Sequence, residues 1–513
     1  MFTMFSQFYK KNLHVVSRFN HTWTLPIGHK TPINIYNCVT RKNESFIVKN
    51  KEAVTWYTCG PTVYDSSHVG HASCYVRLDI IQRILKHHFG LNLVTCMNIT
   101  DIDDKIIKKA YEMKTDFRTL ASTYEKEFWS DLAMLKIPMP DLVLSVTEHV
   151  PIIIDFIQQL EDKEVAYKAQ DNSVYFDITK SPHKPGKLQN ITDSPPEASN
   201  PFKKSKADFA LWKSVKNENE PSFDSPWGKG RPGWHIECSA LASLMFGSNI
   251  DIHAGGLDLR FPHHENEEIQ SSSFHSNNQW VNYWIHTGHL HLKDSVKMSK
   301  SLKNTVSIQD MLKQTKTDVF RMACVKSRYS SAMEYSPDLL QTSSNTLDLY
   351  KNLFRSILDV KKGLIKPSLN NQVINELLTK STIEIHEAFC DDFNTPQVLK
   401  CLDSVASTVN SIIYSSATSS TSKDIYLLLA LNNLVSDTLN LFGIDLSDLS
   451  DSVKNEDFSE FMDILVGFRQ DVRQIGLTNK DKNLLSLCDR LRDDLKKTGL
   501  IVKDYGKISS WNK

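Results

Sequence analysis

Two histidines separated by two residues form the first group of side chains suited to chemistry, His68-Val-Gly-His71. The two imidazoles could donate hydrogen bonds to phosphoryl oxygens, and Gly70 leaves room for a phosphate to approach the backbone of a helix N-terminus. The motif alone is weak evidence, because two histidines near a turn are often ordinary surface residues. It predicts a phosphate site, with surface histidines as the alternative.

Two lysines and two hydroxyls form the second group, Lys297-Met-Ser-Lys-Ser301. The ammonium groups of Lys297 and Lys300 could follow the negative charge of a triphosphate as pyrophosphate leaves, with Ser299 and Ser301 beside them. The alternative is a solvated basic loop, which would be the better interpretation if the segment stood alone.

The third group combines soft metal ligands from distant parts of the sequence. His263 and Glu267 are four residues apart, which places them on one face of a helix, and with Cys59 and Cys238 they supply a four-ligand zinc set. The alternative is two buried cysteines and an unrelated histidine. His264 is expected to point elsewhere on the same helix, so it is left out of the set.

A strand-helix-strand unit is predicted around the first two groups. Residues Val54–Thr58 are β-branched and aromatic and run into the turn-forming Cys59-Gly60-Pro61. Apolar residues recur at helical spacing from 75 to 89, Gly90 suits a helix C-cap, and residues 93–97 are typical of a buried parallel strand.

The rest of the chain shows two changes of texture. Residues from about 182 to 232 are rich in Pro, Ser, Lys and Gly and predict an irregular insertion, after which strands at 250–253 and 283–286 resume the sheet. From Leu339 apolar residues repeat every three or four positions, so the C-terminal third is predicted to be helical, with a loop at 415–422. The acids at 101, 103 and 104 are better explained by a helix N-terminus than by a magnesium site.

Composition bounds the protein class. The chain has 513 residues, 60 Lys and Arg against 60 Asp and Glu, and nine cysteines. This length predicts several domains, and so few cysteines favour a reducing compartment over a disulfide scaffold. The most apolar stretch, residues 150–157, is too short for a membrane span and contains Pro151 and Asp155, so no membrane span is predicted.

The two ends of the chain carry basic residues. No acid precedes Glu44, and this basic, hydroxyl-containing composition predicts a mitochondrial transit peptide over residues 1–30, with an irregular tail as the alternative. Residues 490–513 have seven basic and three acidic side chains. Arg490, Arg492 and the aromatic Trp511 there suit contacts to unpaired RNA bases, whereas the alternative is a charged solvated tail.

Together the first two groups resemble the HIGH and KMSKS signatures of class I aminoacyl-tRNA synthetases. Five further stretches look like the cysteinyl-tRNA synthetase family: residues 58–65, 98–105, 231–240, 251–253 and 261–267. The resemblance runs from about Ile33 to the C-terminus, is dense up to Ser301, and reappears in Asp391-Asp-Phe-Asn-Thr-Pro396.

The resemblance implies an α/β fold: a Rossmann-like parallel sheet with an inserted domain, followed by an all-α C-terminal domain. It implies catalytic halves at 31–135 and 231–330, an inserted connective domain at 136–230, a helical stem-contact region at 331–388, and at 389–513 an anticodon-binding domain with a small terminal module. The implied partners are ATP with Mg²⁺, L-cysteine and tRNA(Cys), in the mitochondrial matrix. A monomer is favoured.

The same resemblance implies residue roles. Cys59, Cys238, His263 and Glu267 would bind one zinc ion, to which the substrate thiolate adds, so that serine is rejected without an editing domain. Surrounding the amino acid would be four residues: Gly60, Thr100, Trp234 and His253. The alternatives are core packing for Trp234, and helix capping by Thr100 together with Asp101.

Two other functions stay open at this point. A ligase that joins the cysteinyl group to a small amine would resemble only the N-terminal two-thirds, and the 182 residues after Ser331 disfavour it. An inactive RNA-binding paralogue is disfavoured by the intact His68, His71, Lys297 and Lys300. Pyrophosphate exchange, with and without acceptors, separates these functions.

Overall fold

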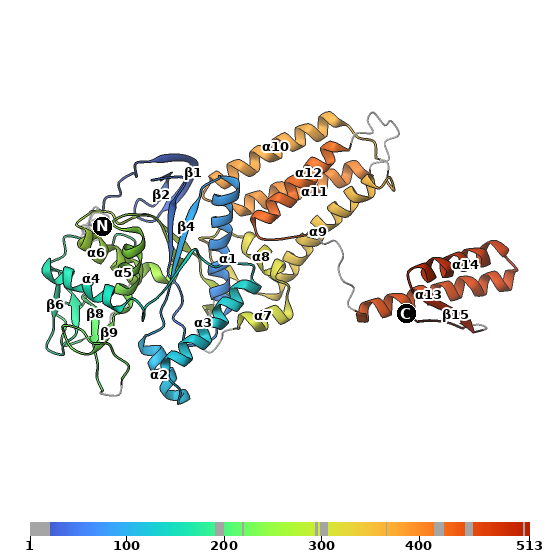
Figure 1. Cartoon of the computed structure of the whole chain (residues 1–513). Coiled ribbons are helices and arrows are strands. Elements are labelled where there is room, and N and C mark those ends of the chain that lie inside the picture. The colour runs from blue at the N-terminus through green and yellow to red at the C-terminus, as the bar shows by residue number, and fades with distance from the viewer. Residues whose placement is uncertain are drawn as a thin grey trace, which may run out of the picture. The chain divides into compact units, whose positions relative to one another are not determined.

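The structure is a computed structural model of the whole chain (Figure 1). It describes residues 21–189, 200–217, 220–292, 296–297, 306–365, 367–414, 425–446, 455–505 and 508–512. The chain divides into two compact units, Met1–Asp445 and Leu446–Lys513. Among the described residues, none of the helices combines the length and the apolar character that crossing a membrane requires.

A five-stranded parallel sheet organises the larger unit, in the order β11-β10-β3-β4-β5. Its strands are β3 (Val54–Thr58), β4 (Leu93–Ile99), β5 (Leu142–Ser145), β10 (Ile250–Gly256) and β11 (Val281–Thr287). The chain builds the sheet outward from β3 to β5 and then returns to build the other side from β10. The predicted strands are therefore confirmed, and β3 and β10 form the switch point, where ligands of open α/β sheets bind.

Helix α1 (Val69–Arg83) makes the crossover between β3 and β4 and continues as the π-helical turn η1 (Ile84–His88). Gly90 follows with a φ of +65°, a backbone conformation that suits the predicted helix C-cap. On the opposite face of the sheet lie α5 (Trp234–Phe246) and α6 (Glu265–His275). Because side chains alternate along a strand, Tyr57 and Cys59 both face α5 and Thr58 faces α1.

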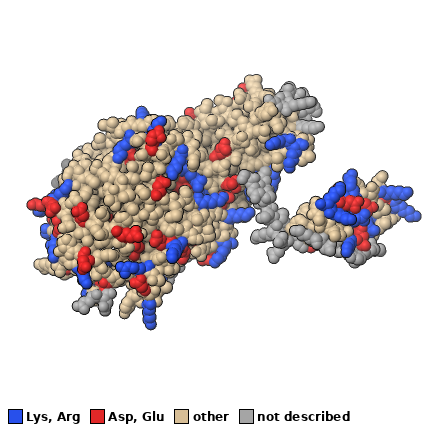
Figure 2. All heavy atoms as spheres, viewed as in Figure 1, with Lys and Arg blue, Asp and Glu red and all other residues tan. Residues whose placement is uncertain are grey.

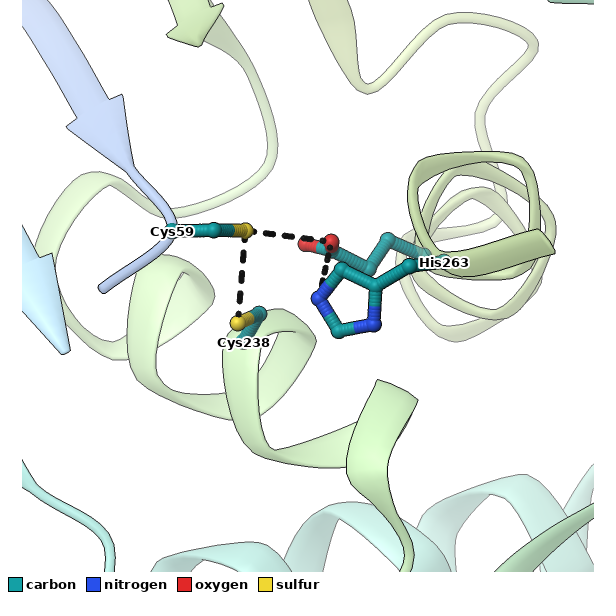
Figure 3. A group of neighbouring side chains, drawn as sticks. Cys59, Cys238 and His263 are labelled. Carbon is teal, nitrogen blue, oxygen red and sulfur yellow. Dashed lines mark hydrogen bonds and ion pairs between the residues drawn. The ribbon is translucent and has the colours of Figure 1, made fainter. Parts of the chain in front are cut away.

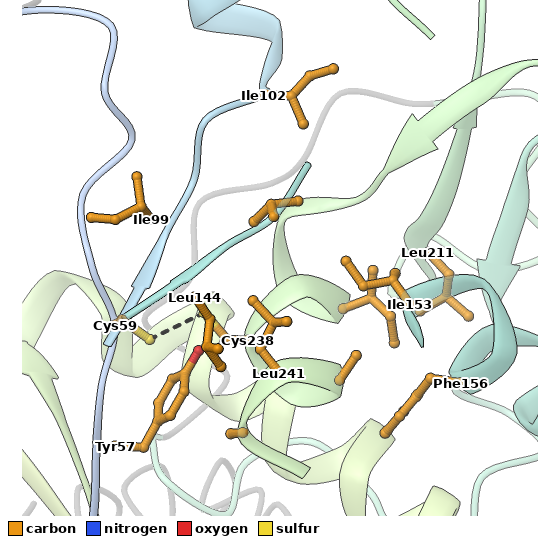
Figure 4. Close-up of a cluster of buried hydrophobic side chains, with 14 of the residues drawn as sticks. Tyr57, Cys59, Ile99, Ile102, Leu144, Ile153, Phe156, Leu211, Cys238 and Leu241 are labelled. Carbon is orange, nitrogen blue, oxygen red and sulfur yellow. Dashed lines mark hydrogen bonds between the residues drawn. The ribbon is translucent and has the colours of Figure 1, made fainter. Parts of the chain in front are cut away.

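The core under α5 joins the sheet to the inserted segment (Figure 4). Tyr57 and Ile99 of the sheet region, Leu241 of α5, and Phe156 of α4 (Val150–Asp162) are all buried there. Truncating one such side chain costs about 2 to 5 kcal/mol, so this core holds α5 firmly against the strand ends.

The insertion between β5 and β10 contains a second sheet, in the order β6-β7-β8-β9 with antiparallel pairing. Its strands are β6 (Ala166–Lys168), β7 (Val174–Phe176), β8 (Phe209–Ser214) and β9 (Gly230–Pro232). The prediction of an irregular segment over 182–232 is therefore wrong for β8 and β9. Leu211 and Trp212 are fully buried, and this packing outweighs the Ser- and Lys-rich surroundings that suggested a loop.

Two short elements precede the sheet and two helices pack beside it. The hairpin of β1 (His29–Asn37) and β2 (Lys42–Val48) lies against β11, where Ile47 donates its N–H to the Tyr283 hydroxyl at 3.0 Å. Helices α2 (Asp104–Met113) and α3 (Phe117–Met134) follow β4. Asp103 caps α2 by accepting from the Lys105 N–H at 2.9 Å, which confirms the predicted helix N-terminus.

The helical part of the larger unit begins with two helices inserted in a small sheet of β12 (Leu290–Leu292), β13 (Val296–Lys297) and β14 (Met333–Glu334), between β13 and β14. Its helices are α7 (Ile308–Gln314), α8 (Thr317–Val325), α9 (Pro337–Lys361), α10 (Asn371–Cys390), α11 (Thr395–Tyr414) and α12 (Tyr426–Leu441). Leu347, Tyr350 and Phe354 are buried at the predicted helical spacing. The loop predicted at 415–422 lies outside the described residues.

A buried arginine joins this helical region to the part of the larger unit that contains the parallel sheet. The Arg321 guanidinium donates to the Phe442 carbonyl at 2.7 Å and the Leu135 carbonyl at 2.8 Å, and it pairs with Asp79 of α1. Nearby, Arg77 of α1 donates to main-chain carbonyls that include Ser331 at 2.8 Å. Helix α1, which begins at the histidine motif, is therefore bonded both to α8 through Asp79 and to the segment around Ser331 through Arg77.

The smaller unit has its own core. It consists of α13 (Asn455–Asn479), α14 (Lys482–Lys497) and the antiparallel pair β15 (Ile501–Tyr505) and β16 (Ile508–Asn512). Met462, Val466, Leu500 and Val502 form that core.

Candidate active site

The candidate site lies where β3 ends beside β10, at the switch point of the sheet. Cys59 follows β3 directly, and its N–H donates to the Ala254 carbonyl of β10 at 3.3 Å. Gly60 comes next, and a Cβ there would lie 1.6 Å from the Asn98 carbonyl oxygen. Only a glycine at position 60 lets the end of β3 approach β4 at Asn98 this closely. This close approach fixes the position of Cys59.

Two helices bring the other members of the group to Cys59. Trp234 begins α5, and Cys238 lies one turn further on. The chain enters α6 through the π-helical turn η4 (Arg260–His264), in which Phe261 has non-helical dihedral angles. His263 at the end of this turn and Glu267 in the first turn of α6 then point to the same side.

These four side chains meet in the protein interior (Figure 3). Their ligand atoms all lie within 4.8 Å of one another, and all four residues are buried. Cys59 Sγ is 3.5 Å from Cys238 Sγ and 3.5 Å from Glu267 Oε1, and His263 Nε2 is 3.0 Å from Glu267 Oε1. Two sulfurs, one imidazole nitrogen and one carboxylate oxygen are donors that suit a zinc ion.

A second, overlapping set contains His264. Cys59, His253, His264 and Glu267 also place their ligand atoms within 4.8 Å of one another, and His264 Nε2 is 3.4 Å from Cys59 Sγ. The expectation that His264 points elsewhere is therefore wrong. The chain bends at Phe261, whose φ of −140° and ψ of 133° are not helical, just before the two histidines. After this bend His264 contacts Cys59 and His286.

The electrostatics of the group favour a positively charged His263 beside a negatively charged Glu267 and Cys238. Burial opposes the charge on every member, but His253 and His263 lower the pKa of Glu267 to about 2. Burial likewise acts against protonated His263, yet Glu267 and Cys238 raise the pKa of this imidazole to about 10. Burial and Cys238 raise the pKa of Cys59, while the hydrogen bond from Cys59 lowers the pKa of Cys238 against the effect of burial. The buried imidazolium of His263 thus compensates the negative charge of Glu267 and Cys238. A divalent cation bound to the group could compensate the same charge.

The predicted amino-acid pocket residues surround this cluster. Trp234 stacks on His263 with ring centroids 4.3 Å apart and is 37% exposed, so it is not plain core. His253 Nε2 lies 2.9 Å from Glu267 Oε2. Thr100 is buried and donates to Glu237 Oε2 at 2.9 Å. Thr100 does not cap α2.

Sequence reasoning gave no role to Asn98 and His235, which contact the group directly, or to Glu237, which bonds to Thr100. Asn98 Oδ1 is 3.5 Å from Cys238 Sγ, and His235 Nδ1 is 2.9 Å from His263 Nδ1. All three lie inside the quoted stretches 98–105 and 231–240. Their position next to assigned residues was the available signal.

The histidine motif forms the N-terminus of α1. His68 is the N-cap residue, and its Nδ1 accepts from the His71 N–H at 3.3 Å while the His71 Nδ1 accepts from the His68 N–H at 3.3 Å. The two rings stack with centroids 3.8 Å apart. Gly70 lies between them, in the first turn. Both imidazoles are thereby held beside the first N–H groups of a helix, where anions bind.

Of the lysine motif at 297–301, the structure describes only the first residue. Lys297 ends β13, whereas Ser299, Lys300 and Ser301 lie outside the described residues. The chain is described again from residue 306, and there it pairs with the histidine motif: the Val69 N–H donates to the Val306 carbonyl at 3.0 Å. The described segment that follows the lysine motif is thus next to the histidine motif.

The predicted RNA contacts belong to the smaller unit, on which basic and acidic side chains lie next to one another (Figure 2). Arg490 is exposed. Arg492 pairs with Asp489 at 3.1 Å, and Trp511 packs edge-on against Phe458 and donates to Asp463 at 2.8 Å. Trp511 therefore takes part in the core of this unit.

Comparisons with known proteins agree with this geometry. Residues 45–345 match the family described as tRNA synthetases class I (C) catalytic domain, and residues 384–447 match the DALR domain. The fold is similar to a methionyl-tRNA synthetase of Mycobacterium tuberculosis, with a TM-score of 0.56 over 76% of this chain and 90% of that chain, at 14% identity. The expected fold class, an α/β parallel sheet followed by a helical region, is confirmed.

Three curated relatives match over most of their length. The chain is 38% identical to a probable mitochondrial cysteine–tRNA ligase of Xenopus tropicalis, over 95% of this chain and 91% of the relative. It is 40% identical to a cysteine–tRNA ligase of Methanococcus maripaludis (93% and 98%) and 36% identical to a cytoplasmic one of Dictyostelium discoideum (92% and 76%). A sulfur-rich donor cluster at the switch point of a class I catalytic fold, with relatives of this kind, leads to one conclusion: the chain belongs to the cysteine–tRNA ligase family of class I aminoacyl-tRNA synthetases.

Proposed function

We propose that this enzyme charges tRNA(Cys) for mitochondrial translation and selects cysteine through a zinc ion held by Cys59, Cys238, His263 and Glu267. The reaction has two steps: cysteine and ATP give cysteinyl-adenylate and pyrophosphate, and the cysteinyl group then passes to the terminal ribose of the tRNA. The observation that carries the proposal is the buried meeting of two sulfurs, one imidazole and one carboxylate beside the switch point of the sheet.

The donor set explains which amino acid is selected. When bound, zinc supplies a strong preference for a thiolate over an unionised hydroxyl, which separates cysteine from serine. The protein contributes the rest: α5 and α6 hold their donors rigidly against the sheet, Trp234 forms one wall, and Gly60, Thr100 and His253 lie around the amino acid. His235 holds the ring of His263 from its other nitrogen, which keeps His263 Nε2 directed at Glu267.

The nucleotide is handled by the two motifs. His68 and His71, fixed at the N-terminus of α1, are proposed to stabilise charge on the α-phosphate, with Gly70 allowing close approach. Lys297 and Lys300 are proposed to follow the leaving pyrophosphate, with Ser299 and Ser301 as further contacts, and Mg²⁺ accompanies ATP.

Metal analysis combined with cysteine-dependent ATP–pyrophosphate exchange tests the proposal. We expect about one zinc per chain, exchange that a chelator abolishes, and restoration by added zinc. Cys238→Ser distinguishes the two overlapping donor sets, because Cys238 belongs only to the first: it should lose zinc and cysteine activation together, since serine is not ionised near neutral pH. His264→Ala should keep the zinc.

The opposite pattern, with zinc retained in Cys238→Ser and lost in His264→Ala, would assign the ion to the second set. Full activity in metal-free protein would remove the zinc from the proposal altogether. Adding either tRNA or a small amine as acceptor separates the proposed ligase from an enzyme that makes small cysteinyl amides.

The proposed location depends on the N-terminal segment. Residues 1–20 of the predicted transit peptide lie outside the described residues, whereas Trp23 donates to the Asn282 carbonyl at 2.9 Å and packs edge-on against Tyr283. Deleting residues 2–20 should therefore keep exchange activity and abolish mitochondrial import. Import of the shortened protein, or a cytosolic full-length protein, would contradict the location.

The domain plan and the partners complete the proposal. We place tRNA contacts on the helical region after residue 331 and on Arg490 and Arg492 of the smaller unit, and we propose that the enzyme acts as a monomer in the matrix. The dissociation constant for tRNA, measured before and after removal of the smaller unit, gives the contribution of that unit to tRNA affinity.

A further inference from the structure

Helix α2 stands out from the larger unit (Figure 1). It begins shortly after β4, and Asp104 in its first turn accepts from Arg231 Nε at 3.1 Å and pairs with Lys213 at 2.7 Å. Arg231 lies three residues before Trp234, which stacks on His263 of the proposed zinc set. The first turn of α2 is therefore tied to the surroundings of the metal group, and the ten residues of the helix extend about 15 Å from there.

The segment that contains α2 is more basic than the chain as a whole. Residues 105–118 carry five basic and two acidic side chains, a net charge of +3, whereas the whole chain is neutral. Of the two acids, Asp116 serves as the N-cap of α3. Glu112 lies 4.0 Å from Lys108, whose side chain is 79% exposed, so water screens this pair. A local positive potential thus remains on α2, and it favours an anionic partner.

An exposed aromatic ring lies among these lysines. Tyr111 is 86% exposed, with Lys108 one turn before it and Lys114 at the C-cap of the helix. Ile106 and Ala110 form the buried side of α2, so the core does not require the tyrosine ring. Unpaired RNA bases stack on aromatic rings placed between cations, while the cations contact the phosphates.

We propose that Tyr111, Lys108 and Lys114 bind the unpaired 3′ end of tRNA(Cys) while its terminal ribose is held beside the metal group. The inference rests on the proposed function, because it takes this tRNA as the acceptor of the cysteinyl group. The terminal ribose has to reach a site at the strand ends, so the nucleotides before it cross the surrounding surface, to which α2 belongs. Paired stem nucleotides would not give this contact, since their bases are stacked inside the double helix.

Two RNAs make the test specific: a tRNA(Cys) transcript with its complete 3′ end, and the same transcript without its unpaired 3′ nucleotides. Tyr111→Ala should raise the dissociation constant of the complete transcript about 5- to 100-fold, the range for one lost base stack, and change that of the shortened transcript less than about twofold. The kcat/KM for charging should fall by the same factor, whereas cysteine-dependent pyrophosphate exchange, in which tRNA takes no part, reports that the active site is intact. Tyr111→Trp keeps an aromatic ring and should retain most of the affinity.

Met113→Ala is the matched control. Met113 lies on the same helix and is 53% exposed, but two residues after Tyr111 it lies on the other side of α2, so both dissociation constants should stay within about twofold of wild type. The lysines have a separate signature: Lys108→Gln and Lys114→Gln together should weaken binding of the complete transcript and lower its dependence on salt concentration.

Equal weakening of the complete and the shortened transcript by Tyr111→Ala would overturn the inference, because it would place the tyrosine against another part of the tRNA. Unchanged binding of the complete transcript would overturn it as well. A wild-type enzyme that carries out the exchange but does not charge tRNA(Cys) gives a different result: it would overturn the proposed function and this inference with it.

Discussion

Asp392 offers a sharp test of how the helical region is attached to the catalytic body. It lies in the turn between α10 and α11, is 4% exposed, and has a φ of +51°. Its Oδ1 accepts from the Tyr329 hydroxyl at 2.8 Å and from the Tyr36 N–H of β1 at 3.0 Å. Asparagine retains the Oδ1 acceptor and tolerates this left-handed backbone conformation well, so Asp392→Asn removes only the ionisable group.

The size of the effect follows from the burial of this carboxyl. Burial raises the pKa of Asp392 to about 6, against the opposing effects of Tyr36, Tyr329 and Arg328, and Asp391 adds to the increase. An unfolded aspartate has a pKa near ~3.9, so about two units separate the states, equivalent to at most about 3 kcal/mol. The folded state binds the proton more tightly, so the carboxyl favours folding below pH ~4, and this contribution is lost as the pH rises through about 6.

Thermal unfolding at several pH values measures the difference. We expect Asp392→Asn to be more stable than the wild type by about 1 to 3 kcal/mol at pH ~7.5 and equal to it near pH ~4, and the pH dependence between those values to shrink. With an unfolding entropy of about 2 cal/mol/K per residue over this large unit, that corresponds to roughly 1 to 3 °C in Tm.

Asp348→Asn serves as the control, because the Asp348 side chain on α9 is 56% exposed and its ion pair with Lys351 contributes at most about 1 kcal/mol. A less stable Asp392→Asn protein at neutral pH, with the original pH dependence, would refute the reasoning. It would mean that the folded structure favours the carboxylate.

Three further predictions concern other parts of the chain. Ending the chain after Asp445 should leave pyrophosphate exchange within about twofold of wild type and weaken tRNA charging, measured with purified transcript, because the two units have separate cores; lost exchange would show that the smaller unit supports the active site. Gly60→Ala should reduce cysteine activation at least about 100-fold, since its Cβ would overlap the Asn98 carbonyl oxygen at 1.6 Å, and normal activity would refute the close approach. Arg469→Met should destabilise the smaller unit by about 1 to 3 kcal/mol in urea unfolding, because the partly buried Asp504 would lose the arginine that it holds at 2.7 and 3.0 Å and keep only the more distant Arg473 and Arg492; an unchanged midpoint would contradict this.

Much of the catalytic fold was predictable because parallel strands are buried on both faces. Such strands are short apolar runs, and Val54–Thr58 and its neighbours stand out in the sequence for that reason. The turn at Cys59-Gly60 follows the first strand directly, so its place at the strand ends could be inferred before the fold was known. The meeting of Cys59 with Cys238 required the resemblance to a family, since 178 residues lie between them in sequence.

Other features depend on interactions that no local pattern encodes. The orientation of His264 depends on the bend at Phe261 that leads into α6, and apolar periodicity does not reveal such a bend. Strands β8 and β9 are stabilised by burial of Trp212 against distant residues, despite a loop-like composition. Trp511 was predicted to stack on RNA bases, and its packing against Phe458 depends on a fold of the smaller unit that charge counting does not reveal.

The joint around Arg321 bears on how such enzymes diverge and can be re-engineered. Apart from Asp79, its partners are the carbonyl oxygens of Phe442 and Leu135, which every residue type would supply equally well. Substitution of the side chains at positions 135 and 442 therefore leaves both carbonyl acceptors of Arg321 in place. A helical region transplanted from another member of the family should pack on this body if its last helix ends at the same place, if the arginine and its aspartate remain, and if position 443 stays glycine, because a Cβ there would lie 2.4 Å from Arg321 Nη2.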